Sequence, residues 1–136
     1  MKRDDLGLLV LRLAGVLLAV TFGITKLAWY WNGLHAGKPL TEIGLVHLID
    51  RMGFPLPFLL AVWITLNESI GALMIACGLF TRAAAASVAL GMVGATYVSI
   101  RLGEDWQRAA LYALVFAGVS LLGPGRWSVD AVRERR

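Results

Sequence analysis

Glu68 is the residue whose type and position most clearly suggest chemistry. It is the only charged residue between Gly53 and Thr81, in a run otherwise apolar enough to cross a membrane. A carboxylate at that depth costs several kcal/mol unless it is protonated or paired, so such residues usually serve a function. We expect Glu68 to be a catalytic, proton-handling group, with Asn67 beside it as a ligand-binding amide. The alternative is a neutral acid, or an ion pair with Arg12, that only fixes helix packing.

The first apolar segment carries two cations that could balance this carboxylate. Arg12 lies about two turns inside the segment. It could snorkel to the inner headgroups or turn inward to meet Glu68. Lys26 follows fourteen residues later and so lies on nearly the same face of an ideal helix. It could snorkel to the outer interface or place a cation at the mouth of the bundle, and both interpretations stay open for each residue.

Few other residues suggest chemistry. Trp63 and Tyr97 could line a binding pocket for a flat ring, although packing between helices is the commoner role of such residues. Cys77 cannot form a redox pair alone, and two histidines without matching carboxylates do not predict a metal site. The motifs of serine hydrolases, phosphate loops and dinucleotide-binding folds are absent from the sequence. Any electrons would therefore come from a partner or a bound molecule.

The composition indicates which elements must position these residues. Hydrophobic residues make up 58% of the chain, charged residues make up 16%, and the mean hydropathy is +0.70. Soluble domains carry about a quarter charged residues, so this much apolar surface requires lipid around it. The net charge is +4 without a basic stripe interleaved with aromatic residues, which argues against nucleic acid as a partner and leaves membrane lipids.

The expected fold is an all-α membrane protein, a single domain containing an antiparallel bundle of four transmembrane helices. Backbone groups in lipid have no water to bond, so each apolar run should be a helix. A short amphipathic segment, residues 41–52, should lie on the membrane surface between the first two helices. The four helices are expected at residues 6–29, 57–80, 83–100 and 106–122.

The distribution of lysine and arginine favours both termini in the cytoplasm. With that orientation, seven cations lie on the inner side and five on the outer side. The inner set is Lys2, Arg3, Arg82, Arg126, Arg133, Arg135 and Arg136, and the outer set is Lys26, Lys38, Arg51, Arg101 and Arg108.

Four stretches of the chain resemble the DoxX family of four-helix bacterial membrane proteins. They are LVLRLAGVLLAVTFGITKL in the first helix, MGFPLP before the second, NESIGALMIACGLFTRAAA from the middle of the second helix into the third, and LLGPGRWSVD at the end of the fourth. The residues that match the family pattern are Arg12, Lys26, Glu68, Thr81, Arg82 and the turn at residues 123–126. The resemblance implies a protein of the bacterial inner membrane, linked to quinone-dependent sulfur oxidation or to complexes that handle oxidative stress.

These observations favour a membrane subunit that binds a quinone or quinol, or a similar lipid-soluble ligand, and works with a partner oxidoreductase. No covalently bound cofactor is implied, and whether the chain itself is an enzyme stays open. One alternative is a non-catalytic scaffold that docks a soluble oxidoreductase, and another is a small proton-coupled transporter. The sequence leaves the oligomeric state open, and a homo-oligomer is one of the states that it allows.

Overall fold

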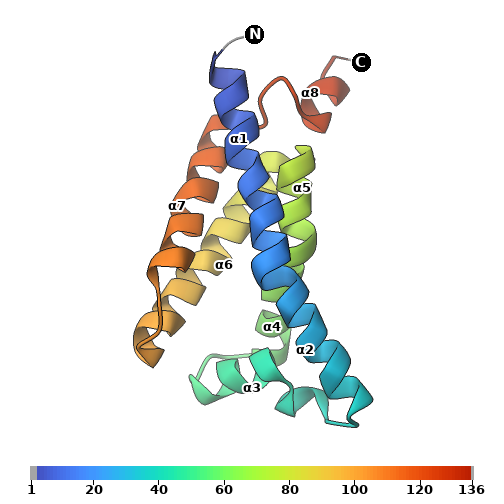
Figure 1. The fold of residues 1–136 in the computed structure, drawn as a ribbon, viewed down its shortest axis with the longest axis vertical. Helices are drawn as coiled ribbons and strands as arrows, with labels where there is room; N and C mark the ends of the chain where they lie inside the picture. Colours follow the sequence, from blue (N-terminus) through green and yellow to red (C-terminus); the bar gives the residue numbers. More distant parts are fainter. Residues whose placement is uncertain (1–2, 136) are drawn as a thin grey trace.

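A computed structural model describes residues 3–135, and every regular element among them is helical (Figure 1). The expected all-helical fold is therefore confirmed. Met1, Lys2 and Arg136 lie outside the described residues, including two of the cations used to predict orientation.

The first helix is longer than the expected 6–29. It comprises α1 (Arg3–Leu18), a π-helical turn η1 (Ala19–Gly23) and α2 (Ile24–His35) without a break. It ends before Gly37, whose positive φ of 70° side chains rarely adopt. The connection to the next long helix is correspondingly shorter than the stretch left between the expected helices 6–29 and 57–80.

That connection contains a short amphipathic helix. A 3₁₀ turn η2 (Leu40–Glu42) precedes α3 (Gly44–Arg51). The apolar side chains of Leu45, Val46 and Ile49 are buried, while His47 and Asp50 on the opposite face are exposed. α3 thus packs as a cap against the start of the second long helix.

The second long helix also contains a π-helical turn. It consists of α4 (Pro57–Leu66), η3 (Asn67–Gly71) and α5 (Ala72–Cys77). Gly78 then adopts a φ of 76° and ends it, three residues before the expected limit. Two further helices come next and pack side by side, α6 (Thr81–Leu102) and α7 (Gln107–Leu122), with a short α8 (Val129–Arg133) after them.

Small residues let the first two long helices approach closely. A Cβ added at Gly15 would lie 2.3 Å from the carbonyl oxygen of Ala72, and one at Gly23 would lie 2.6 Å from that of Glu68. Ala19, between them, is buried. This face of the first helix brings its backbone against η3 and α5, as small residues commonly do in membrane bundles.

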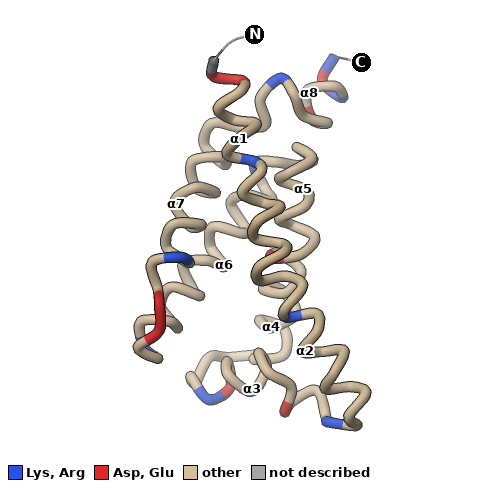
Figure 2. The backbone as a smooth tube through the Cα atoms, viewed as in Figure 1, with Lys and Arg blue, Asp and Glu red and all other residues tan. Residues whose placement is uncertain are grey.

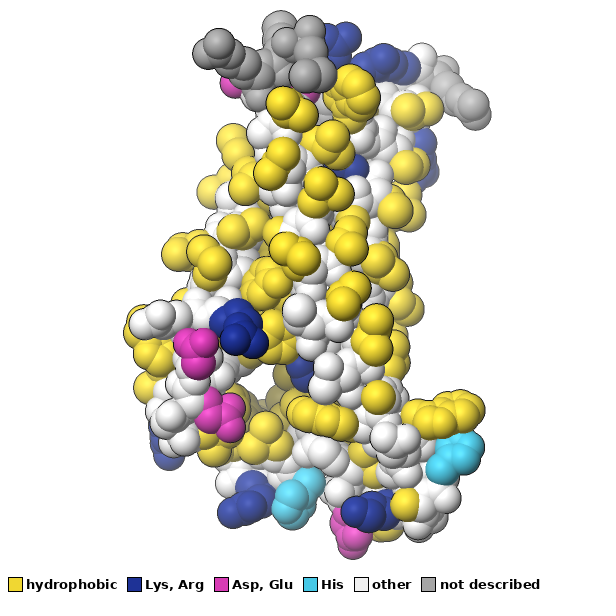
Figure 3. Space-filling view, in the orientation of Figure 1, with side chains coloured by type: hydrophobic (Ala, Val, Ile, Leu, Met, Phe, Trp, Pro, Cys, Tyr) yellow, Lys and Arg dark blue, Asp and Glu magenta, His cyan; other side chains and the backbone are white. Residues whose placement is uncertain are grey.

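The outer surface of the bundle is apolar. Leu90, Leu114 and Leu121 are 64%, 73% and 81% exposed, and similar side chains cover the shaft in Figure 3. Charged residues gather at the two ends, with few between them (Figure 2). Among residues 3–135, three helices are long and apolar enough to cross a membrane, at Asp4–His35, Pro57–Cys77 and Thr81–Leu102, and α7 is a shorter apolar helix. Such a surface suits contact with lipid.

Candidate functional site

Glu68 forms an ion pair with Lys26 inside the bundle. The Lys26 ammonium donates a hydrogen bond to a carboxylate oxygen of Glu68. The carboxylate is 1% exposed and the lysine side chain 12% exposed, so the pair is almost completely removed from solvent. Lys26 is thus the cation that balances the buried carboxylate.

Both partners belong to helix segments distorted by π turns. Glu68 lies within η3, and Lys26 is less than one turn beyond η1. The two π turns face each other, and Gly23 lies against the backbone of Glu68. Single π turns inside α-helices occur frequently at functional sites because the extra residue changes which side chains point inward.

A row of aromatic rings extends from the lysine across to α7. The ammonium lies 5.4 Å from the centroid of the Phe22 ring, a cation–π distance. Phe22 meets Tyr112 edge to face at 6.0 Å, and Tyr112 stacks on Phe116 at 5.9 Å. The charged pair therefore has a wall of flat apolar surface on one side.

Asn67 and Trp63 lie on the same helix as Glu68. Asn67 is buried, and its amide nitrogen donates to the carbonyl oxygen of Trp63 at 2.8 Å. The amide still has a second N–H, since an asparagine carries two donors. The Trp63 ring packs over Gly91 of α6, where an added Cβ would lie 3.8 Å from it.

Tyr97 lies further along α6, toward the α3 end of the bundle. Its ring meets Phe54 edge to face at 6.0 Å, and its hydroxyl accepts a hydrogen bond from Arg101 at 3.0 Å. Figure 3 shows an opening through the molecule between the end of the α6–α7 pair and α3. A lysine or arginine side chain is visible at its edge.

Arg12 does not meet Glu68, so that expected alternative is wrong. Arg12 as a whole is 2% exposed, so its side chain does not snorkel to the headgroups either. It donates four hydrogen bonds of 2.8–3.0 Å to backbone carbonyls, at the end of α5 and in the turn after α7. The acceptors are Ile75, Ala76, Pro124 and Trp127. Arg12 therefore joins three chain segments at one end of the bundle.

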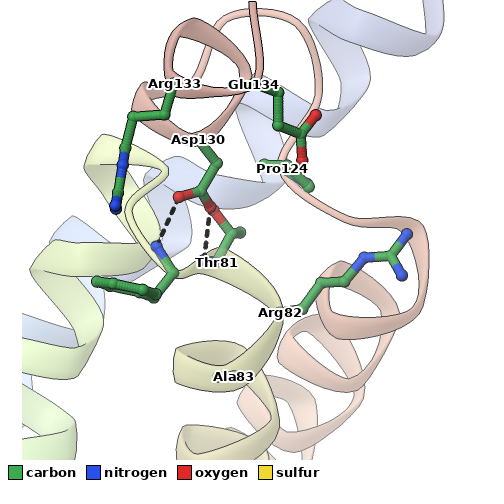
Figure 4. A pocket seen from close by; sticks show the side chains of 8 residues that line it. Thr81, Arg82, Ala83, Pro124, Asp130, Arg133 and Glu134 are labelled. Atoms are coloured by element: carbon green, nitrogen blue, oxygen red, sulfur yellow. Dashed lines mark hydrogen bonds between the residues drawn. The ribbon is translucent and has the colours of Figure 1, made fainter. Parts of the chain in front are cut away.

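Asp130 reinforces the same junction (Figure 4). Its carboxylate accepts hydrogen bonds from the backbone N–H groups of Phe80 and Thr81 and from the Thr81 hydroxyl, at 2.8–2.9 Å. Burial raises the pKa of this carboxyl, but these bonds and nearby Arg133 outweigh burial and leave the pKa below its ordinary value. Asp130 thus caps the start of α6 from a distant segment.

Helical spacing could have predicted three further side chains near the Lys26–Glu68 pair. Phe22 and Tyr30 lie four residues before and after Lys26, on the same helical face. Thr65 lies three residues before Glu68 on its own helix. Spacing from the two charged residues would have found all three side chains.

The long apolar helices and their apolar outer surface indicate a multi-pass membrane protein. The sequence model of the DoxX family matches residues 7–101, which include Lys26, Glu68 and both π turns. The chain therefore belongs to the DoxX family. No curated protein and no solved structure shows a significant match to it.

Proposed function

We propose that the protein is an antiparallel bundle of four transmembrane helices in the bacterial cytoplasmic membrane, with both termini in the cytoplasm. The start of α1 and the end of α7 lie at the same end of the bundle, as four crossings would require (Figure 1). α7 has 16 residues, which span about 24 Å, less than the roughly 30 Å of hydrocarbon. Trp106 and Trp127 flank α7 and suit the two interfaces.

The proposed role of this bundle is to bind a quinone, or a similar lipid-soluble ring, and to exchange a proton with it. The observation that carries the proposal is the buried Lys26–Glu68 pair, which lies beside a row of aromatic rings. An intramembrane ionisable pair in a bundle interior is a functional site by default. In this proposal the ring enters through the opening between the end of the α6–α7 pair and α3 (Figure 3).

Each residue of the site has a separate task in this proposal. Reduction of a quinone to a quinol consumes two electrons and two protons, so Glu68 exchanges a proton while Lys26 donates to a ring oxygen and balances charge. Asn67 offers its remaining amide hydrogen, and Trp63 and Tyr97 supply flat apolar walls. The electrons come from a partner oxidoreductase, because the single cysteine cannot form a redox pair.

A binding measurement tests the role of Glu68. Decylubiquinone is titrated into protein held in lipid nanodiscs, and the affinities of wild type and Glu68→Gln are compared. Loss of a charge-assisted interaction should weaken binding at least about tenfold. Gly94→Ala is the control, because an added Cβ there meets nothing within 4 Å. An unchanged affinity in Glu68→Gln would show that the proposed site is wrong.

The aromatic contact between Tyr97 and Phe54 gives a second test. Tyr97→Ala and Phe54→Ala remove the rings that meet at 6.0 Å, so both should weaken decylubiquinone binding. Tyr97→Phe keeps the ring and loses only the hydrogen bond from Arg101, so its affinity should stay near that of wild type. Equal losses in Tyr97→Phe and Tyr97→Ala would exclude a role for the ring itself.

A second function, docking a soluble oxidoreductase without catalysis, is favoured by the polar outer face of α3. His47, Asp50 and Arg51 are exposed on this face, opposite the side that packs against α4. Under this proposal, Asp50→Lys with Arg51→Glu should abolish complex formation, measured by co-purification of tagged protein from native membranes. Glu68→Gln should then lower stability without releasing the partner.

A further inference from the structure

Tyr30 places a hydroxyl where packing alone does not require one. It lies four residues after Lys26, one helical turn nearer the α3 end on the same face. Its ring packs among apolar residues of α3 and α4. The hydroxyl is fully enclosed and makes no hydrogen bond of good geometry with any residue from 3 to 135. A phenylalanine would fill the same space, so the hydroxyl calls for a separate explanation.

A candidate partner of that hydroxyl is another buried hydroxyl. Thr65 is 6% exposed, and its side chain lies beside Tyr30. Its hydroxyl donates to the carbonyl oxygen of Ala61 at 2.8 Å, which leaves oxygen lone pairs free to accept a proton. Thr65 precedes Glu68 by three residues, so it lies one turn from the carboxylate along its own helix.

These groups form a polar line between two apolar regions. One core cluster surrounds Leu18, Ile75 and Phe116, and the other surrounds Val46, Ile49 and Ala61 beneath α3. Along the two helices, Thr65 and the Lys26–Glu68 pair lie between these clusters, and Tyr30 packs against the second cluster. The line leads from the buried pair toward the α3 end of the bundle.

We propose that Tyr30 and Thr65 relay protons between the α3 end of the bundle and Glu68. Each hydroxyl accepts a proton on an oxygen lone pair and releases its own, so the relay leaves both side chains unchanged. The proton originates from water at the α3 end and finishes on the Glu68 carboxylate. This inference rests on the proposed function, since it supplies the proton that Glu68 exchanges.

Infrared spectroscopy of the carboxyl group tests the relay. In Lys26→Met the unpaired Glu68 should be protonated, so the C=O stretch of its carboxyl group should appear in the infrared spectrum. The band is identified by its loss in the double variant Lys26→Met/Glu68→Gln, and it shifts when water is replaced by D₂O. Lys26→Gln is a second background if Lys26→Met folds poorly. Adding Tyr30→Phe or Thr65→Val should slow this exchange at least about tenfold, since a positioned proton donor commonly contributes more than that.

Controls separate a relay from a packing effect. Thr25→Val removes a lipid-facing hydroxyl that bonds to the Thr21 carbonyl oxygen on the same helix as Tyr30, and should leave the exchange rate unchanged. Tyr30→Phe should not lower the thermal unfolding temperature, because it removes a hydroxyl that lacks a partner among residues 3–135. Exchange as fast in Tyr30→Phe as in its parent, or equal slowing by Thr25→Val, overturns the relay.

The relay and the proposed function fail in different ways. If Glu68→Gln binds decylubiquinone as tightly as wild type does, the proposed function is wrong whatever the exchange rates are. If decylubiquinone affinity depends on Glu68 while the exchange rate does not depend on Tyr30 or Thr65, the ligand site is supported and the relay is wrong.

Discussion

Lys26 and Glu68 are 42 residues apart in the chain and form an ion pair where π turns of their two helices face each other. The position of Gly23 permits this approach, because its backbone lies directly against that of Glu68. The pair is thus fixed by the backbone of both helices rather than by side-chain reach alone. A change in either charge or in the backbone contact should therefore alter the packing of both helices.

Removing one charge of the pair should destabilise the protein more than removing both. Breaking a buried pair costs about 3–5 kcal/mol, whereas an apolar replacement of both partners is often nearly neutral. We expect Glu68→Leu and Lys26→Met to lower the free energy of unfolding singly, and the double variant to recover most of that loss. Unfolding in mixed detergent micelles measures all four proteins. Simple additivity of the two single losses would show that the charges do not interact.

The close approach at Gly23 predicts a steric effect with a matched control. A Cβ there would lie 2.6 Å from a backbone oxygen, which cannot move aside as a flexible side chain can. Gly23→Ala should therefore destabilise the fold by about 1–3 kcal/mol through overpacking. Gly94→Ala meets nothing within 4 Å and should be neutral or slightly stabilising. Thermal unfolding of the two variants makes the comparison, and equal stability would contradict it.

The apolar run around Glu68 predicted the buried carboxylate, whereas helical periodicity did not decide between Arg12 and Lys26 as its partner. Arg12 and Lys26 share a face only on an ideal helix, and η1 lies between them. The extra residue of a π turn rotates the rest of the helix by roughly 100°, so the two cations point to different neighbours. Hydropathy likewise placed the end of the first helix near Trp29, whereas the helix continues to His35. Apolar runs mark the depth of hydrocarbon, and a helix can extend beyond it into polar surroundings.

Arg12 should be essential for folding, but its charge should not contribute to ligand binding at the Lys26–Glu68 site. Its four carbonyl acceptors lie in different directions around a planar guanidinium, and a lysine offers no such fork. Arg12→Lys should therefore destabilise the protein nearly as much as Arg12→Met, by about 3 kcal/mol or more. The measurement is thermal unfolding, together with decylubiquinone affinity at a temperature where the variant is folded. A stable Arg12→Lys variant with weakened binding would instead favour a charge role.

Asp130 should make the stability of the protein depend on pH in the acid range. Burial opposes ionisation, but the three hydrogen bonds from Phe80 and Thr81 lower the pKa of its carboxyl. The folded pKa lies below the unfolded value of about 3.9. The stabilisation is therefore complete above that value and is lost as the pH falls through the folded pKa. At neutral pH, Asp130→Asn should lose about 1 kcal/mol, because the hydrogen bonds from Phe80 and Thr81 would then go to a neutral amide oxygen in place of a carboxylate. The free energies of unfolding of wild type and Asp130→Asn, measured across the acid pH range, should differ less as the pH falls. A difference that is independent of pH would mean that the carboxylate charge does not contribute to stability.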